Sequence, residues 1–282
     1  MINYAGVADE FCSFENAAVL LQSIPYDGTS TWGKGADKGF EAFLDASENM
    51  ELYDIETRSE VYHKGVHILP ALTEDDSPEA MFKEVYEKTQ ELLQTGKYLT
   101  FFGGEHSISI GVIKAFYEKY DNLTVLQLDA HTDLRPQFHG SPYNHACAVY
   151  DASKNTNLIQ VGIRSMDIEE EEHLDRSKVY FAEEMYGNTD WMDASIAQMT
   201  NDVYLTIDLD AFDPAIMPAT GTPEPGGMDW NTMIKYVRRV FTEKNVVGFD
   251  IVELAPIDGY KAPQFLVAKL YYKMLTYKFM VS

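Results

Sequence analysis

The segment Leu123-Thr-Val-Leu-Gln-Leu-Asp-Ala-His-Thr-Asp133 joins an apolar run to three polar side chains spaced by two residues. Its first half is rich in strand-forming residues, as expected of a parallel strand that is covered on both faces. Alternate side chains of an extended chain share a face, so we expect Asp129, His131 and Asp133 to point the same way. Crowded carboxylates repel one another unless a cation neutralises them, so this cluster predicts a divalent-cation site rather than a polar surface loop.

The 282-residue chain is strongly acidic, with 45 Asp and Glu residues against 22 Lys and Arg residues and a formal net charge of -23. This balance opposes binding to nucleic acids or to anionic membranes and favours cationic small molecules. The composition is that of a globular protein, and because no linker is evident we expect a single domain over residues 1–282. Two distant cysteines, Cys12 and Cys147, indicate a reducing compartment, and the absence of a secretion signal predicts a cytoplasmic location.

Apolar strand-like runs alternate with amphipathic, helix-like segments along the chain. We predict strands over residues 17–23, 98–102, 123–128, 158–162, 203–210 and 246–254, and helices over residues 77–94, 108–120, 190–200, 230–241 and 263–277. Residues 54–66 are also predicted to be strand-like. Ser77 and Asp229 have the residue types and positions of helix N-caps. The alternation predicts a three-layer α/β/α sandwich with a mainly parallel central sheet.

Ligating side chains follow the carboxyl ends of several predicted strands, where open α/β sheets bind ligands. The candidate metal ligands are His106, Asp129, His131, Asp133, Asp208 and Asp210. Four carboxylates and two imidazoles exceed the needs of one ion, so the set predicts two divalent ions that share carboxylates, as in two-metal hydrolases. Oxygen-rich ligation without a thiolate favours manganese over zinc, although ligand type alone leaves magnesium and iron open.

Some polar residues in the sequence have simpler interpretations. His106 alone could cap the helix that follows it, and the Gly103-Gly104 pair lacks the full pattern of a phosphate-binding loop. Residues 134–146 contain two histidines, His139 and His145, of which we expect one to transfer protons. The acidic run at residues 169–172, followed by His173, is interpreted as a solvated helix face.

Three motifs resemble the signatures of the ureohydrolases, the arginase and agmatinase family. They are Gly103-Gly-Glu-His-Ser107, Asp129-Ala-His-Thr-Asp133 and Thr206-Ile-Asp-Leu-Asp-Ala-Phe-Asp-Pro214. The resemblance extends from Pro25-Tyr-Asp-Gly28 to Glu253-Leu-Ala-Pro256. It implies an arginase-like three-layer fold, two Mn²⁺ ions per chain, and assembly into a homotrimer or a homohexamer.

The resemblance also implies a role for each candidate residue. One manganese ion would be held by His106, Asp129, Asp133 and Asp208, and the other by His131, Asp129, Asp208 and Asp210. Asp129 and Asp208 would therefore bridge the two ions. Glu253 would bind the guanidinium group of the substrate, and His145 would transfer protons. In the mechanism that we expect, Asp133 takes part in this proton transfer with His145.

The substrate is suggested by the loops around the motifs. Arginases carry Asn, Thr and Ser residues after their Asp-x-His-x-Asp motif, whereas this chain has Arg135-Pro-Gln-Phe-His-Gly-Ser-Pro. Residues 141–146 and 220–227 look more like those of bacterial and archaeal agmatinases, and a dicationic substrate suits an acidic chain. We therefore expect hydrolysis of agmatine to putrescine and urea.

Several alternatives to agmatine hydrolysis remain open from the sequence. The same chemistry could act on arginine or on guanidinobutyrate, whose carboxylate Arg135 could bind. The chain could also be a catalytically silent metal-binding family member. A deacetylase-like hydrolase with one zinc ion would leave the Asp208 and Asp210 pair unused. The sequence alone does not assign roles to Arg135 and His139.

Overall fold

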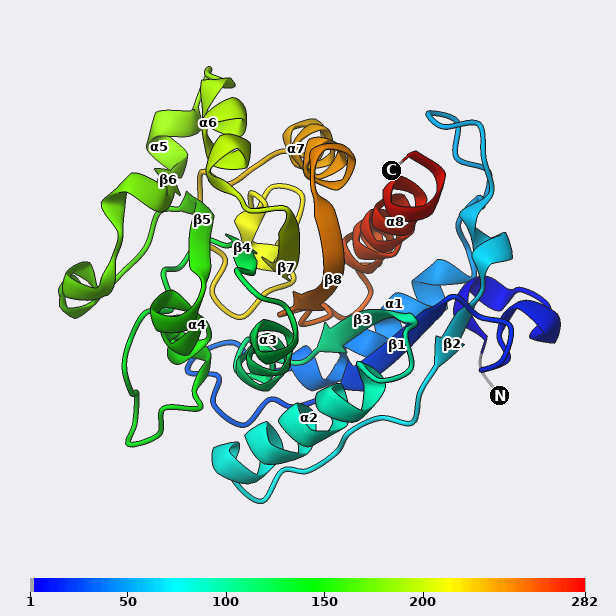
Figure 1. Ribbon diagram of the computed structural model, residues 1–282, viewed down its shortest axis with the longest axis horizontal. Coiled ribbons are helices and arrows are strands. Elements are labelled where there is room, and N and C mark those ends of the chain that lie inside the picture. The colour runs from blue at the N-terminus through cyan, green and yellow to red at the C-terminus, as the bar shows by residue number, and fades with distance from the viewer. Residues whose placement is uncertain (1–2, 282) are drawn as a thin grey trace.

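The computed structural model describes residues 3–281, and within them a single sheet of eight strands runs through the centre of the molecule (Figure 1). The strands are β1 (Val19–Ile24), β2 (Val66–Ile68), β3 (Tyr98–Gly103), β4 (Thr124–Leu128), β5 (Asn157–Ile163), β6 (Val179–Phe181), β7 (Asp202–Asp208) and β8 (Asn245–Val252). Their order across the sheet is β2-β1-β3-β8-β7-β4-β5-β6, and every neighbouring pair is parallel. The predicted parallel sheet is confirmed.

Helices cover both faces of the sheet. They are α1 (Gly39–Ser47), α2 (Pro78–Leu92), α3 (Ile108–Lys119), α4 (Tyr150–Asn155), α5 (Ala182–Met185), α6 (Asp190–Gln198), α7 (Trp230–Glu243) and α8 (Ala262–Thr276), which continues as a π-helix over Tyr277–Val281. Figure 1 shows α2, α3 and α4 on one side of the sheet and α1, α7 and α8 on the other. No helix within residues 3–281 has the length and hydrophobicity needed to cross a membrane.

Two hydrophobic cores explain why the strands are so apolar. Every residue of β4 is buried, and alternate side chains enter different cores. Leu126 and Leu128 pack with residues of α1, α7 and α8, whereas Val125 packs with residues of α2 and α3. The three-layer sandwich predicted from the sequence is therefore confirmed, because both faces of the central strand must be covered by apolar side chains.

Local capping signals are also realised. The Oγ of Ser77 accepts a hydrogen bond from the backbone N–H of Ala80 at 3.1 Å, which begins α2. The carboxylate of Asp229 accepts from two backbone N–H groups in the first turn of α7. These contacts satisfy amide groups that have no partner inside the helix, so the two cap predictions are confirmed.

The prediction of a strand-like segment over residues 54–66 is wrong for most of its length. Asp54 and Ser59 close a short turn through a single antiparallel bridge, and β2 begins only at Val66. The buried ammonium group of Lys273 in α8 binds the carboxylates of Asp54, at 2.8 Å, and of Glu56. A helix more than 200 residues away therefore sets the shape of this segment, which local sequence cannot reveal.

Candidate active site

The carboxyl ends of four adjacent strands meet at one cavity of about 280 Å³. These strands, β3, β8, β7 and β4, are neighbours in the sheet although their order along the chain is different. His106 follows β3, Asp208 ends β7, and Glu253 follows β8. Asp133 follows β4, and all four side chains line the cavity. The crossing order of the strands thus gathers residues that lie more than a hundred positions apart in the sequence.

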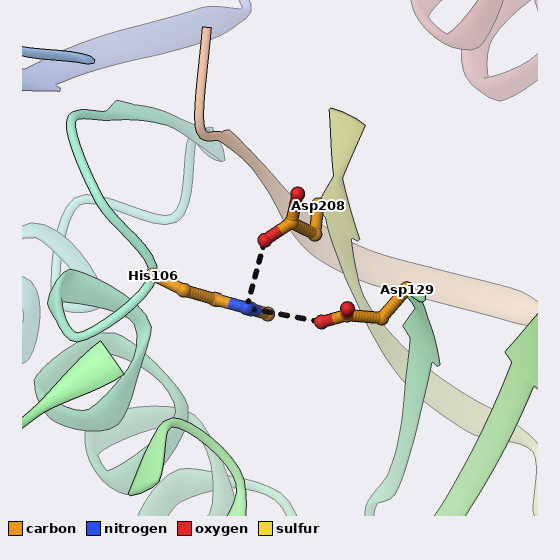
Figure 2. Close-up of side chains that lie close together, drawn as sticks. All are labelled: His106, Asp129 and Asp208. Carbon is orange, nitrogen blue, oxygen red and sulfur yellow. Dashed lines mark ion pairs between the residues drawn. The ribbon is translucent and has the colours of Figure 1, made fainter. Parts of the chain in front are cut away.

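The six predicted metal ligands form two adjoining groups. In the first, the Nδ1 atom of His106 lies 3.1 Å from Asp129 Oδ2, 3.0 Å from Asp133 Oδ2 and 3.4 Å from Asp208 Oδ2. Figure 2 shows His106, Asp129 and Asp208 pointing toward one another from three different segments.

In the second group, the Nδ1 atom of His131 lies 2.9 Å from Asp210 Oδ2 and 3.7 Å from Asp129 Oδ1. Asp129 belongs to both groups, because one of its oxygens faces each histidine.

The hydrogen bonds of His106 show which of its ring nitrogens faces the carboxylates. The hydroxyl of Thr206 donates to Asp250 Oδ1 at 2.7 Å, so at 2.9 Å it must accept from the Nε2–H of His106. Nδ1 is buried, and among the described residues it makes no hydrogen bond. With Nε2–H held by Thr206, Nδ1 points at three carboxylate oxygens, which is the orientation of a histidine that binds a metal cation.

The charges of the cluster also call for a cation. Burial raises the pKa of Asp133 to about 7, with a further contribution from the negative charge of Asp129. Burial, followed by the charges of Asp210 and Asp129, raises the pKa of Asp208 well above its ordinary value. Burial and the neighbouring carboxylates thus both disfavour the ionised forms of Asp133 and Asp208, and divalent ions would stabilise those forms. The donor set therefore fits divalent cations held mainly by oxygen.

The backbone places two of the predicted site residues in an unexpected way. We expected Asp133 to continue the alternation of β4, but that strand ends at Leu128 and Asp133 has a left-handed φ of 50°. Glu253 also has a left-handed φ, of 69°, and its Oε1 accepts from the backbone N–H of His106 at 2.9 Å. Left-handed conformations are costly for residues with a Cβ and cluster at functional sites. Asp133 therefore reaches the cluster through a turn, so the alternation argument is wrong for this residue.

The glycine pair before His106 has a packing role. A Cβ on Gly104 would lie 1.9 Å from the carbonyl oxygen of Tyr26, so only glycine allows the turn after β3 to pass this backbone. The same approach brings the loop after β1 to the edge of the cavity.

The two histidines of the loop after Asp133 occupy different places. His145 lines the cavity and begins the short 3-10 helix His145–Cys147, which the side chain of Asn144 caps. Burial lowers the pKa of His145 to about 4, with further contributions from the charges of His106 and His131. His139 is exposed and is not among the cavity residues. The structure therefore brings His145, and not His139, to the cluster of predicted ligands.

Arg135 lies in the cavity wall with its charge already compensated. Its Nη2 lies 3.1 Å from Asp167 Oδ2, and its Nε lies 3.8 Å from Glu170 Oε2. The guanidinium carbon stands 4.4 Å from the centre of the Phe138 ring. These contacts hold the side chain flat against the wall, so that it is not a free cation.

The interpretation of residues 169–172 as a solvated helix face is wrong for one residue. Glu170 is buried, and its Oε1 accepts from Thr132 Oγ1 at 2.7 Å and from the backbone N–H of Leu134 at 2.8 Å. Glu170 also completes a capping box with Asp167, in a 3-10 helix over Ile168–His173. The Asp-x-x-Glu spacing was a sequence signal for this box. Glu170 thus secures the loop on both sides of Asp133.

Comparison with known proteins places the chain among enzymes. The sequence profile of the arginase family matches residues 17–276. N(1)-aminopropylagmatine ureohydrolase of Synechocystis sp. is 37% identical, over 96% of this chain and 92% of its own length. Agmatinase of Bacillus subtilis is 30% identical, over 86% of each chain.

A solved structure agrees with these sequence relatives. The agmatine ureohydrolase of Thermoplasma volcanium has a TM-score of 0.88 and 29% identity, over 99% of this chain and 94% of that chain. Both the sequence and the fold therefore match over almost the whole chain. The chain belongs to the arginase family and is a ureohydrolase.

Proposed function

We propose that this ureohydrolase hydrolyses agmatine to putrescine and urea with two Mn²⁺ ions per chain, as a step of polyamine biosynthesis. The observation that carries the proposal is one cavity in which two His–Asp groups adjoin the carboxylate of Glu253. Oxygen-rich ligation without a thiolate is the reason to prefer manganese to zinc.

The proposed ligand sets follow the two groups. One ion would be held by His106, Asp129, Asp133 and Asp208, and the other by His131, Asp129, Asp208 and Asp210. When bound, such a pair lowers the pKa of water and makes hydroxide available as a nucleophile near neutral pH. The orientation of His106 Nδ1 toward three carboxylates supports its assignment as a ligand.

Glu253 is the proposed partner of the substrate guanidinium group. Its Oε1 is held by the backbone N–H of His106, which orients the carboxylate at the cavity wall. Burial and the charges of Asp208 and Glu105 raise its pKa well above the ordinary value, and a bound guanidinium cation would stabilise its ionised form. A carboxylate and a planar guanidinium can form two parallel charge-assisted hydrogen bonds.

His145 and Asp133 are the proposed proton carriers. Asp133 lies within the ligand group and can hold a proton from the attacking water on its carboxylate. His145 lines the same cavity and, because its pKa is low, is neutral at pH 7 and can take up and pass on a proton. The proton it transfers goes to the nitrogen of the departing amine as the C–N bond breaks.

The cavity wall argues against a substrate that carries a carboxylate. Arg135 is the residue that could have anchored guanidinobutyrate or arginine, but Asp167 and Glu170 already bind it. A substrate carboxylate there would face two protein carboxylates, and an unpaired buried charge is costly. The amine of agmatine meets no such repulsion.

N(1)-aminopropylagmatine is a second candidate substrate, because relatives from Synechocystis and Thermus thermophilus have the name of its ureohydrolase. It keeps the same guanidino group on a longer tail that is also cationic. The contacts of Glu253 and His145 with the reacting end would be unchanged, so the tail end of the cavity decides between the two compounds.

Urea release from agmatine, N(1)-aminopropylagmatine, arginine and guanidinobutyrate, measured on one manganese-loaded preparation, tests the proposal. Agmatine should exceed arginine and guanidinobutyrate in kcat/KM by orders of magnitude. A higher value for the aminopropyl compound would select the second candidate, and preference for guanidinobutyrate would refute the argument from Arg135. Release of no urea from any of the four would identify a catalytically silent protein. The Asp129→Ala variant serves as the inactive control.

We also propose that the protein acts in the cytoplasm as a homotrimer or homohexamer, as the family resemblance implies. Light scattering coupled to size-exclusion chromatography would give the mass of the assembly directly. A monomer of 32.0 kDa would contradict this part of the proposal.

A further inference from the structure

The ring of His145 is held from behind by a residue of the loop after β1. The Oγ1 of Thr29 donates to Glu105 Oε2 at 2.8 Å and accepts from the backbone N–H of His145 at 3.0 Å. The same oxygen lies 3.1 Å from the Nδ1 of His145. Glu105 is fully buried, and its other oxygen accepts from the hydroxyl of Ser107 at 2.5 Å. Residues from three distant segments thus meet behind the imidazole.

We propose that Thr29 and Glu105 are positioning residues that hold neutral His145 with its proton on Nδ1, so that Nε2 exchanges the proton used in the reaction. A threonine hydroxyl has one proton, and here Glu105 accepts it. The contact between Thr29 and Nδ1 can then be a hydrogen bond only if Nδ1 is the donor. The inference rests on the proposed role of His145 as a proton carrier.

The metal ligand His106 is held by a hydrogen-bond chain of the same kind. In that chain Asp250 accepts from Thr206, which accepts from the Nε2–H of His106 and so directs Nδ1 toward the carboxylates. In the chain behind His145 the order of the ring nitrogens is reversed, because Thr29 contacts Nδ1. Each histidine is therefore held through one ring nitrogen by a carboxylate–threonine pair, while its other ring nitrogen has no contact with that pair.

The chemical consequence is a defined path for one proton. A proton from the water consumed in hydrolysis is carried on Nε2 of His145. It passes to the amine nitrogen as that nitrogen keeps the electron pair of the broken C–N bond. His145 returns to the neutral form with Nδ1–H still bound to Thr29, ready for the next turnover. The opposite tautomer would present an N–H where an acceptor is needed, as in proteases that lose the aspartate orienting their histidine.

The experiment compares Thr29→Val, which keeps the side-chain shape but removes the hydroxyl, with Thr29→Ser, which retains the hydroxyl. Ser30→Ala is the matched control, because the neighbouring Ser30 hydroxyl is buried and has no hydrogen-bond partner within the described chain. Thr29→Val should lower kcat roughly 10- to 100-fold, with KM and manganese content unchanged. Thr29→Ser should restore most of kcat, and Ser30→Ala should match the wild type.

A second measurement reads the tautomer without any activity. Nitrogen-15 NMR of the metal-free, histidine-labelled protein at pH 7, with the His145 signals assigned by their loss in His145→Ala, should show the proton on Nδ1. In Thr29→Val the same signals should shift toward a mixture of both tautomers. A substitution that affects only the stability of the fold would leave the tautomer signals of His145 unchanged.

Two results would overturn the inference: a proton on Nε2 in the wild type, or an unchanged kcat and tautomer in Thr29→Val. Full urea release by His145→Ala would instead refute the proposed catalytic role of His145. Because NMR reports the tautomer without turnover, the two failures are distinguishable.

Discussion

Replacing Thr206 by valine should weaken manganese binding while preserving the fold. Thr206 is fully buried in β7, and valine has nearly the same shape and a high strand propensity. The substitution removes the hydroxyl that accepts from His106 Nε2–H and donates to Asp250. The imidazole of His106 then loses the contact that fixes its tautomer and its orientation toward Asp129, Asp133 and Asp208.

The expected magnitude follows from these two hydrogen bonds. Loss of the partner that orients a metal-binding histidine typically costs about 10- to 100-fold in affinity, or about 1.4 to 2.7 kcal/mol. The variant should also unfold more easily in the metal-free state, because an unsatisfied buried polar group costs about 1–3 kcal/mol. Asp250 keeps its hydrogen bond from Tyr204 at 2.7 Å, so the strand pair β7–β8 should remain in place.

The assay is a titration of metal-free protein with manganese in the presence of a competing chelator, combined with thermal unfolding. Thr206→Ser should bind nearly as well as the wild type, because it retains the hydroxyl. Thr100→Val is the matched control. Thr100 is equally buried, in β3, and its hydroxyl contacts the Leu20 carbonyl at 3.1 Å and the Tyr271 hydroxyl at 2.8 Å. This control should lose stability but not manganese affinity.

Wild-type manganese affinity in Thr206→Val, together with the expected loss of stability, would refute the reasoning. That outcome would mean that Thr206 does not orient His106, or that His106 is not a ligand. A similar loss of affinity in Thr100→Val would show that general destabilisation, and not the contact with His106, weakens binding.

Three further predictions test the proposed roles directly. The wild type should bind two manganese ions per chain, and Asp129→Ala or Asp208→Ala should lose most metal and activity because each carboxylate is expected to be shared between the ions. Elemental analysis that plateaus at one ion per chain with full activity would contradict this prediction. His145→Ala should lower kcat on the order of 10²–10⁴-fold with metal content intact. His139→Ala should change kcat only slightly, because His139 is exposed outside the cavity. The reverse ranking in urea assays would exchange the roles of the two histidines. Glu253→Gln should severely lower kcat/KM for agmatine without loss of metal, since a neutral amide turns N–H donors toward the donors of the substrate. An unchanged kcat/KM would show that Glu253 does not bind the substrate.

The sequence by itself determined the architecture and the identity of the residues at the cavity. Apolar runs such as Thr124–Leu128 can be stable only when both faces are covered, so they predict a parallel sheet between helices. The residue types and spacings of Asp129, His131, Asp208 and Asp210 predict a cation site, because ligand chemistry belongs to the side chains and not to the fold. Caps such as Ser77 are local as well, since donor and acceptor are three residues apart.

The positions of individual site residues depend on the tertiary structure. Asp133 and Glu253 have left-handed backbone conformations, which only the surrounding contacts can maintain. Glu170 looked like part of a solvated acidic run, but the loop after β4 buries it. The sequence showed only that such residues were acidic, because burial is a property of the packed molecule.

The partners of the two site histidines depend even more on the packing of distant segments. Thr29 contacts His145, which lies 116 positions away in the sequence, and Thr206 contacts His106, which lies 100 positions away. Asp250, which accepts from Thr206, carries no sequence pattern that separates it from other acidic residues, and the motif that contains Glu105 does not reveal its contact with Thr29. The order β3-β8-β7-β4 brings these groups together, and that order results from the burial of two cores at once. The sequence thus specified which chemical groups are present, whereas long-range packing decided which nitrogen of each histidine contacts a threonine.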